Sequence, residues 1–160
     1  MENLLNKESV KRVSKKLKEF DSKLEVLVLD TSARTAQDAA KSLDTEVGSI
    51  IKSLFLRTKN SFLLCLIAGD KRCSLNKIKK ILNEKDVSMG SAEQVKEITG
   101  FTIGGVSPVG HLSPLKIYID QSLERFSSIF GAAGHPNCVF KINFANLQKI
   151  TNGEIKDISE

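Results

Sequence analysis

The sequence predicts an α+β fold, a mixed β-sheet flanked by short helices, and three observations support this prediction. Some segments place apolar residues at helical spacing, whereas others carry short apolar runs typical of strands. The two kinds of segment are interspersed without the regular strand–helix alternation of a parallel α/β fold. Hydrophobic residues make up 41% of the 160 residues, which is enough for a core. Because no linker, repeat or low-complexity tract divides the chain, we expect a single domain over residues 1–160.

The first half of the chain carries signals for two helices and three strands. Apolar residues at helical spacing predict a helix over residues 7–20 with a basic outer face. Thr35, with Asp38 at the third helical position, is typical of an N-cap and predicts a short alanine-rich helix as far as Leu43. The predicted strands cover residues 24–29, 49–57 and 61–68, and the last two are joined by a hairpin turn at 57–60.

The second half carries further cap signals. Ser74 is expected to cap a helix whose inward residues are Leu75, Ile78, Ile81 and Leu82. Ser91 and Gln94 form a capping-box pattern for a helix that ends at Gly100. Beyond a glycine-rich loop we expect a strand at 115–120 and a helix opened by Ser122 with Leu123, Phe126, Ile129 and Phe130 inward. A strand at 138–142, a helical turn at 144–148 and a strand at 155–158 complete the prediction.

Composition excludes several classes of protein. No apolar run reaches the roughly 18–20 residues that a membrane span needs, and the first residues are too polar for a signal peptide, so we expect a cytoplasmic protein. The odd number of cysteines, with no CxxC spacing, argues against a disulfide framework. His135 and Cys138 form one HxxC pair, but no second ligand pair is visible. We therefore expect no metal and no cofactor.

The net charge of +5 suggests an anionic partner. Basic residues cluster within residues 7–18 and again within 71–85. Solvated helix faces and nucleic-acid binding explain these clusters equally well. With aromatic residues at only 6% and no tryptophan, a stacking platform for single strands is not supported.

Lys52 is a lone charge in the apolar segment Ile50–Leu56. On an edge strand, such a lysine usually lays its stem along the surface and keeps its ammonium in water. The functional interpretation is a partly desolvated ammonium at a cleft wall that holds a carbonyl or phosphate oxygen. Both interpretations are open on the sequence alone.

Residues 100–110 hold four glycines and a proline within an apolar run. Glycine lets main-chain groups approach a ligand closely, and proline stiffens the path between them. The segment matches neither GxGxxG nor a P-loop, so known nucleotide loops are excluded. More glycine is present than a hairpin requires, which favours a ligand-binding loop over a simple turn. The candidate binding residues here are Gly104, Gly105, Val106, Ser107 and Pro108.

A second small-residue loop, residues 131–137, contains Gly134 and His135. Its small residues would allow another chain or a ligand to approach, and His135 could donate or accept a hydrogen bond, although a structural loop histidine is the commoner case. We expect His111, after Gly110, to be exposed. No Ser/His/Asp spacing or paired carboxylates indicate a nucleophilic triad.

With Lys52, the GGxSPxG loop at 104–110 and the 131–136 loop in this order, the chain resembles the YbaK/EbsC family of aminoacyl-tRNA deacylases. These are related to the editing domain of bacterial prolyl-tRNA synthetases. The resemblance covers about residues 24–158, and the Ile119–Asp120 pair also agrees with it. It implies a curled mixed sheet flanked by helices. It also implies hydrolysis of the ester between a wrong amino acid and the terminal adenosine of a tRNA, most plausibly tRNA(Pro).

The resemblance also assigns roles. The family's essential lysine falls on Lys52, and its GxxxP loop falls on Gly104–Pro108, where main-chain groups hold the adenosine, the carbonyl and the water. The family has no protein nucleophile and relies on positioning and on a ribose hydroxyl of the substrate, which agrees with the missing triad. Where the cysteine-specific branch has a serine-glycine-glycine segment, this chain has Ala132–Pro136. Alanine, cysteine, serine and 2-aminobutyrate all stay open as the amino acid removed.

Two other functions are compatible with these residues. The chain could be a non-catalytic tRNA-binding or synthetase-associated module of the same fold, although retention of both Lys52 and the loop argues against it. It could instead hydrolyse a small free aminoacyl ester or nucleotide. The expected partners are a mischarged aminoacyl-tRNA and, as an open question, an aminoacyl-tRNA synthetase, with no membrane.

Overall fold

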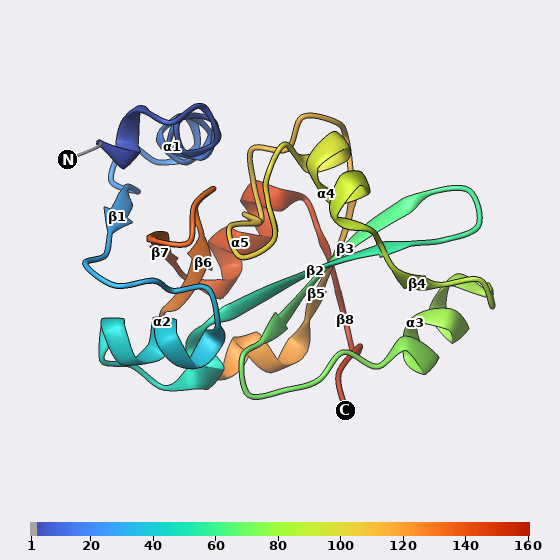
Figure 1. Cartoon of the computed structure of the whole chain (residues 1–160). Coiled ribbons are helices and arrows are strands. Elements are labelled where there is room, and N and C mark those ends of the chain that lie inside the picture. The colour runs from blue at the N-terminus through green and yellow to red at the C-terminus, as the bar shows by residue number, and fades with distance from the viewer. Residues whose placement is uncertain (1–2) are drawn as a thin grey trace.

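The computed structural model describes residues 3–160 and has an α+β architecture (Figure 1), as the sequence predicts. Its helices are α1 (Glu8–Phe20), α2 (Ala36–Leu43), α3 (Leu75–Leu82), α4 (Ala92–Thr99) and α5 (Phe144–Thr151). Three short 3-10 helices are η1 (Leu4–Asn6), η2 (Val47–Ser49) and η3 (Gln121–Arg125). The strands are β1 (Val26–Val28), β2 (Ile51–Arg57), β3 (Phe62–Ala68), β4 (Ser88–Met89), β5 (Lys116–Asp120), β6 (Ile129–Ala132), β7 (Cys138–Ile142) and β8 (Glu154–Lys156).

The strands form two sheets. The larger sheet has the order β4-β2-β3-β5-β8 and is mixed, because β2 is antiparallel to its neighbours whereas β3, β5 and β8 run parallel. The smaller sheet, β1-β7-β6, is antiparallel. A parallel bridge between Ile50 and Phe130 connects the two sheets. The predicted mixed sheet is therefore present, with its strands divided between two sheets that meet at the start of β2.

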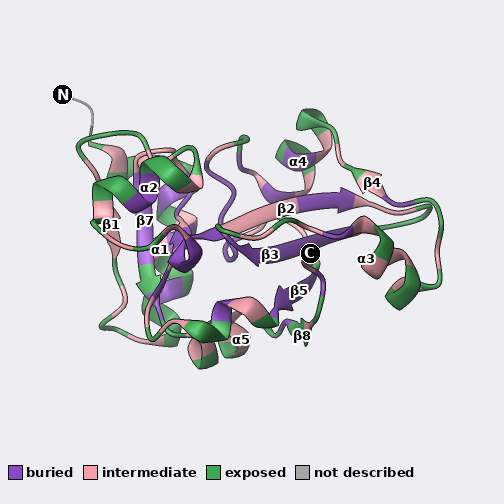
Figure 2. Cartoon of the chain, turned by 90° about the horizontal axis from the view of Figure 1, so that it is seen from below, coloured by how far each residue is buried: buried purple, intermediate pink, exposed green. Residues whose placement is uncertain are grey.

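Strand β3 is buried on both faces and divides the core (Figure 2). Leu64 and Leu66 pack into the main cluster, which also takes residues from α1 and the smaller sheet. Leu63, Cys65 and Ile67 point to the opposite face and pack with Ile78 of α3. Unbroken apolar sequence in β3 is the consequence of this two-sided burial.

The predicted caps at Thr35, Ser74 and Ser91 are confirmed. The hydroxyls of Thr35 and Ser74 accept hydrogen bonds from the third residue of α2 and α3 respectively. Ser91 and Gln94 form a complete capping box at the start of α4, and Gly100 ends this helix with a φ of 79°. Each cap satisfies backbone donors that the first turn leaves free, so local chemistry determines where these helices begin.

Two local predictions are wrong. Residues 121–125 form a 3-10 helix capped by Asp120, not a helix opened by Ser122, and residues 129–132 form β6. The spacing of Ile129 and Phe130 fits a helix, but pairing with β7 overrides that local preference. Ile81 of α3 is 39% exposed instead of facing inward. The short strand β4 and the helices η1 and η2 carry too few residues for a periodic signal.

Within residues 3–160, the structure contains no helix long and apolar enough to cross a membrane.

Candidate active site

The candidate site lies at an unpaired stretch along one edge of β2. At its start, Ile50 bridges to Phe130 of β6, and at its other end, Leu56 pairs with Met89 of β4. Between these contacts, the edge of residues 51–54 that faces away from β3 pairs with no strand among residues 3–160. A strand edge of this kind presents main-chain donors and acceptors to whatever lies beside it.

A cavity of about 440 Å³ opens beside this edge. Its wall is largely apolar, and it includes Lys52 and Ser53 from β2 together with Gly104 and Val106 from the glycine-rich loop. Arg34 and the start of α2 form another part of the wall. The fold therefore brings the lysine and the first part of the glycine loop, about 50 residues apart in sequence, to one cavity. The residues that line the cavity and are described by the structure include no aspartate or glutamate.

Lys52 is half-buried, and its ammonium donates a hydrogen bond to the main-chain carbonyl of Lys71. Burial lowers the pKa of Lys52, and the nearby Asp70 carboxylate partly opposes this effect. The ammonium is thus held by the protein, not free in bulk water as an ordinary edge-strand lysine would be. An ammonium has three donors, so those not used by Lys71 are available to a bound molecule.

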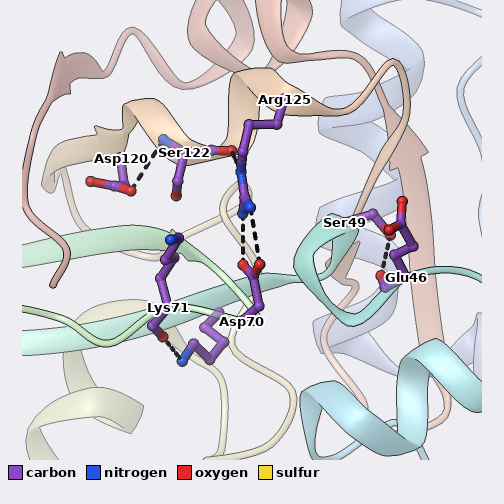
Figure 3. Close-up of polar contacts among 8 residues, drawn as sticks. Glu46, Ser49, Asp70, Lys71, Asp120, Ser122 and Arg125 are labelled. Atoms are coloured by element: carbon purple, nitrogen blue, oxygen red, sulfur yellow. Dashed lines mark hydrogen bonds and ion pairs between the residues drawn. The ribbon is translucent and has the colours of Figure 1, made fainter.

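The Asp70 carboxylate, which acts on the Lys52 ammonium, is held in place by Arg125. The two side chains form a two-pronged ion pair, with nitrogen–oxygen distances of 3.0 and 2.6 Å, beside Lys71 (Figure 3). The guanidinium lowers the pKa of Asp70, so the carboxylate stays charged. Both side chains are partly exposed, so the ion pair contributes little to stability. The Asp70 carboxylate that it holds in place raises the pKa of Lys52.

The glycine-rich loop has its side chains turned mostly into the protein. Ser107 is fully buried, and its hydroxyl accepts a hydrogen bond from the Val109 amide at 3.1 Å. His111 is half-buried instead of exposed, since its Nε2 lies 2.7 Å from the Ser107 carbonyl and its ring packs edge-on against Phe101. Pro108 is buried as well. Only Gly104 and Val106 of the five predicted loop residues line the cavity.

The second loop lies directly behind the first. The Gly134 amide donates to the Gly105 carbonyl at 3.1 Å. A Cβ on Gly105 would lie 2.9 Å from the His135 nitrogen, so glycine permits the two main chains to touch. The His135 Nδ1 accepts a hydrogen bond from the Asn137 amide within its own turn. Gly134 and His135 thus support the glycine loop and do not line the cavity.

Helix α1 holds both loops through two side chains that the sequence did not indicate. Arg12 donates to the carbonyl of Gly110 at 3.1 Å and to that of Gly100 at 3.0 Å, at the two ends of the loop. The Ser9 hydroxyl donates to the Gly134 carbonyl at 2.8 Å. Because the partners are main-chain carbonyls about 90 to 125 residues away, no local motif marks these contacts.

Ser53 is a second residue that the sequence did not indicate. Its hydroxyl oxygen is buried and has no hydrogen-bond partner among residues 3–160. A buried hydroxyl without a partner is uncommon and costs free energy. The only sequence signal for it is its position next to Lys52.

The same part of the chain holds no group of three or more His, Cys, Asp or Glu side chains arranged to bind a metal ion. All three cysteines are free thiols, and Cys65 and Cys138 are buried as small core residues. The cavity wall therefore offers the held ammonium of Lys52, the guanidinium of Arg34, the unpaired edge of β2 and the glycine loop. These groups can orient and polarise a polar molecule, and the described lining residues include no His, Asp or Glu that could activate the Ser53 hydroxyl as a nucleophile.

A comparison with known protein families identifies the family of this chain. The model of the aminoacyl-tRNA editing domain matches residues 30–150, which contain β2, the glycine loop and the second loop. The chain belongs to the aminoacyl-tRNA editing domain family. The family resemblance inferred from Lys52 and the two loops is thus confirmed. This family acts on aminoacyl-tRNA and also occurs within prolyl-tRNA synthetases.

Individual relatives agree with this assignment. One relative is EbsC of Enterococcus faecalis, which is named as a candidate Cys-tRNA(Pro)/Cys-tRNA(Cys) deacylase. The two sequences are 27% identical over 126 residues, which cover 78% of this chain and 77% of EbsC. A proline–tRNA ligase of Kosmotoga olearia is 35% identical over 98 residues, covering 61% of this chain but 17% of the ligase.

A solved structure extends the likeness to the whole editing domain fold. This structure is described as that of a candidate trans-editing enzyme for prolyl-tRNA synthetase. It superimposes on this chain with a TM-score of 0.90 and 34% sequence identity, covering 96% of this chain and 98% of the solved one. The α+β fold of the editing domain family is therefore the fold of this chain.

Proposed function

We propose that this protein is a trans-editing deacylase that hydrolyses the ester of a mischarged small amino acid on tRNA, with tRNA(Pro) as its main substrate. The observation that carries this proposal is the cavity at the unpaired edge of β2, where Lys52, Gly104 and Val106 meet. Family membership supports the reaction class, and the relatives support the tRNA. The proposed setting is the cytoplasm, where tRNAs are charged, and the proposed unit is one domain over the chain.

In this reaction a water molecule adds to the ester carbonyl, and the bond between the carbonyl carbon and the ribose oxygen breaks. The products are the free amino acid and the tRNA with its ribose hydroxyl restored. Lys52 would donate a hydrogen bond to the carbonyl oxygen as negative charge develops there. Its bond to the Lys71 carbonyl would fix the direction of the ammonium before substrate binds. Because an ester is already activated, orientation and one cation can supply much of the acceleration.

Within the predicted segment Gly104–Pro108, the main-chain groups of Gly104 and Val106, which line the cavity, would hold the terminal adenosine and the attacking water. For Gly134 and His135 we propose a supporting role, since they brace Gly105 from behind. The largely apolar wall and the absence of acidic side chains among the described lining residues favour a small, weakly polar amino acid. Such a pocket complements a synthetase site, which separates amino acids that differ by one methylene by only about 1–3 kcal/mol.

A panel of charged tRNAs tests this proposal. Purified protein is incubated with tRNA(Pro) carrying alanine, cysteine, serine or 2-aminobutyrate, and with Pro-tRNA(Pro) as the correctly charged control. We expect rapid release of one small amino acid and slow release of proline. Lys52→Met should reduce kcat/KM at least about 100-fold, whereas Lys59→Met, an exposed lysine at the β2–β3 turn outside both basic clusters, should leave it unchanged.

Two results would contradict the proposal. Binding of the charged tRNAs without ester cleavage would favour a non-catalytic tRNA-binding module. Equal cleavage of aminoacyl-adenosine and aminoacyl-tRNA would favour a hydrolase of small esters.

A further inference from the structure

The mouth of the cavity differs in character from its interior. Ile103 and Met89 stand at the rim and are 64% and 56% exposed, which is unusual for large apolar side chains. Arg34, Thr35 and Gln37 are the other exposed residues that line the cavity, and Arg34 is the one that carries a charge. The rim therefore offers apolar surface and one guanidinium to a molecule that enters the cavity.

Arg34 is held at this rim by its neighbours in the chain. The Ala33 amide donates to the Pro136 carbonyl at 2.6 Å, which ties the segment to the second loop. Thr35 immediately begins α2 as its N-cap. The position of the Arg34 main chain is thus fixed on both sides.

The side chain of Arg34 lies over the glycine loop itself. A Cβ on Gly104 would come within 3.0 Å of the Arg34 Cγ and 3.1 Å of its Nε. Gly104 has a φ of 96°, in the left-handed region, and its bare main chain lets the arginine stem pass over the loop. The guanidinium is therefore placed next to the residue that we assign to substrate binding.

Among residues 3–160, Arg34 makes one hydrogen bond, from its main-chain amide to the Ser32 hydroxyl, and its guanidinium has no hydrogen bond, ion pair or ring contact. The other arginines near the site are engaged: Arg12 binds main-chain carbonyls and Arg125 binds Asp70. Lys52, the other cation on the cavity wall, is bonded to Lys71. An unpaired guanidinium beside a cavity with no acidic lining residue among those described is suited to an anion from outside the protein.

We propose that Arg34 binds the phosphodiester that precedes the terminal nucleoside of the substrate tRNA. This inference rests on the proposed function. The ester joins a 2′ or 3′ oxygen of the terminal ribose, whereas the first phosphate joins its 5′ oxygen. With the ester inside the cavity, that phosphate lies one ribose further out, at the level of the rim. A guanidinium recognises phosphate oxygens through parallel N–H donors, and Ile103 and Met89 give apolar surface for the base.

Two substrates separate this role from a general effect on the site. The first is mischarged tRNA, and the second is the same amino acid esterified to adenosine, which has no phosphate. Arg34→Gln should lower kcat/KM on the tRNA by about tenfold, and the loss on aminoacyl-adenosine should be at least about fivefold smaller. The slope of log(kcat/KM) against log[salt] on the tRNA should become shallower by about 0.7, the value for one phosphate contact on a single strand. Arg34→Lys should give an intermediate loss.

Lys59→Gln is the matched control, because it removes one exposed charge at the β2–β3 turn. This variant should leave kcat/KM unchanged on both substrates. Three results would each overturn the inference: Arg34→Gln lowers kcat/KM equally on both substrates, it lowers kcat/KM on neither, or Lys59→Gln lowers kcat/KM on the tRNA as much as Arg34→Gln does.

A binding measurement keeps this test separate from that of the proposed function. The affinity of a CCA trinucleotide RNA and of adenosine is measured for the wild type and Arg34→Gln by titration calorimetry. If the wild type hydrolyses no charged tRNA, the proposed function fails. The Arg34 contact still stands if the variant weakens only the trinucleotide, and it falls if the trinucleotide binds both proteins equally.

Discussion

The guanidinium of Arg12 lies over the ring of Phe101, 4.9 Å from its centre. The same group donates hydrogen bonds to the carbonyls of Gly100 and Gly110. One side chain of α1 thus covers the start of the glycine-rich loop and connects its two ends. The loop needs such support, because glycine-rich main chain loses much conformational entropy on folding.

Arg12→Met should lower the free energy of unfolding by about 2 kcal/mol, since it removes charge-assisted hydrogen bonds and the positive charge over the Phe101 ring. Methionine keeps an apolar stem over the ring, so the loss reports mainly the hydrogen bonds. The free energy of unfolding of Arg12→Lys should lie between those of Arg12→Met and the wild type. Urea denaturation measures these values, and Lys11→Met, an exposed neighbour on the same helix, is the control. A change below about 0.5 kcal/mol in Arg12→Met would contradict this role, because surface substitutions reach that size.

Sequence patterns predicted the elements that local chemistry determines. The caps at Thr35, Ser74 and Ser91 could be found because a side chain and the backbone donor it satisfies lie three residues apart. Strand β6 could not, since its extended form depends on pairing with β7, and its apolar spacing also fits a helix. Ser122 is a residue type common at helix N-caps, which is why the sequence predicts a cap there, but the Asp120 carboxylate occupies that position.

For the site, the sequence identified residues but not their arrangement. Lys52 and the glycine loop stand out because a charge and several glycines are unusual in apolar runs. Their meeting at one cavity depends on how β2, β4 and β6 leave an edge unpaired, which no local pattern encodes. Arg12 and Arg34 resemble any other surface arginine in sequence, because main-chain contacts far along the chain decide their roles.

The proton of Lys52 should leave at a lower pH than its ordinary value of 10.5, because burial lowers the pKa of this group. A lowered lysine pKa means that the unfolded chain holds the proton more tightly, so this group stabilises the fold increasingly as pH rises through that range. Activity that needs the ammonium should fall over the same range. Asp70→Asn removes the carboxylate that raises the pKa, so the midpoint should move lower still.

Side-chain NMR titration of labelled lysine measures this midpoint. Asp157→Asn is the matched control, since Asp157 is an exposed ion-pair partner of Lys77. A midpoint that stays in place or rises in Asp70→Asn would refute the assigned electrostatics.

Ser53 and Ser107 form a natural pair of tests for the unpartnered hydroxyl. The Ser53 hydroxyl is buried without a partner among the described residues, whereas that of Ser107 accepts from the Val109 amide. Ser53→Ala should therefore leave the free energy of unfolding unchanged or raise it by up to about 1 kcal/mol, and Ser107→Ala should lower it by about 1–2 kcal/mol. Urea denaturation of both variants checks this difference. Equal losses in both would mean that Ser53 has a partner after all.

His111 should make the protein less stable as pH falls below 6.5. Burial lowers the pKa of His111 from its ordinary value of 6.5; the hydrogen bond to the Ser107 carbonyl partly opposes this, and the Arg12 charge adds a smaller lowering. A lowered histidine pKa means that the unfolded chain binds the proton first. The stabilisation is thus complete above 6.5 and is lost as pH falls towards the lower pKa of the folded protein, by at most about 1.4 kcal/mol per pH unit.

His111→Gln keeps a nitrogen donor for the Ser107 carbonyl but does not titrate. Urea denaturation of both proteins between pH 5 and 8 measures the effect, and the difference between them isolates His111 from His135. Parallel curves for the two proteins would show that His111 does not titrate differently on folding.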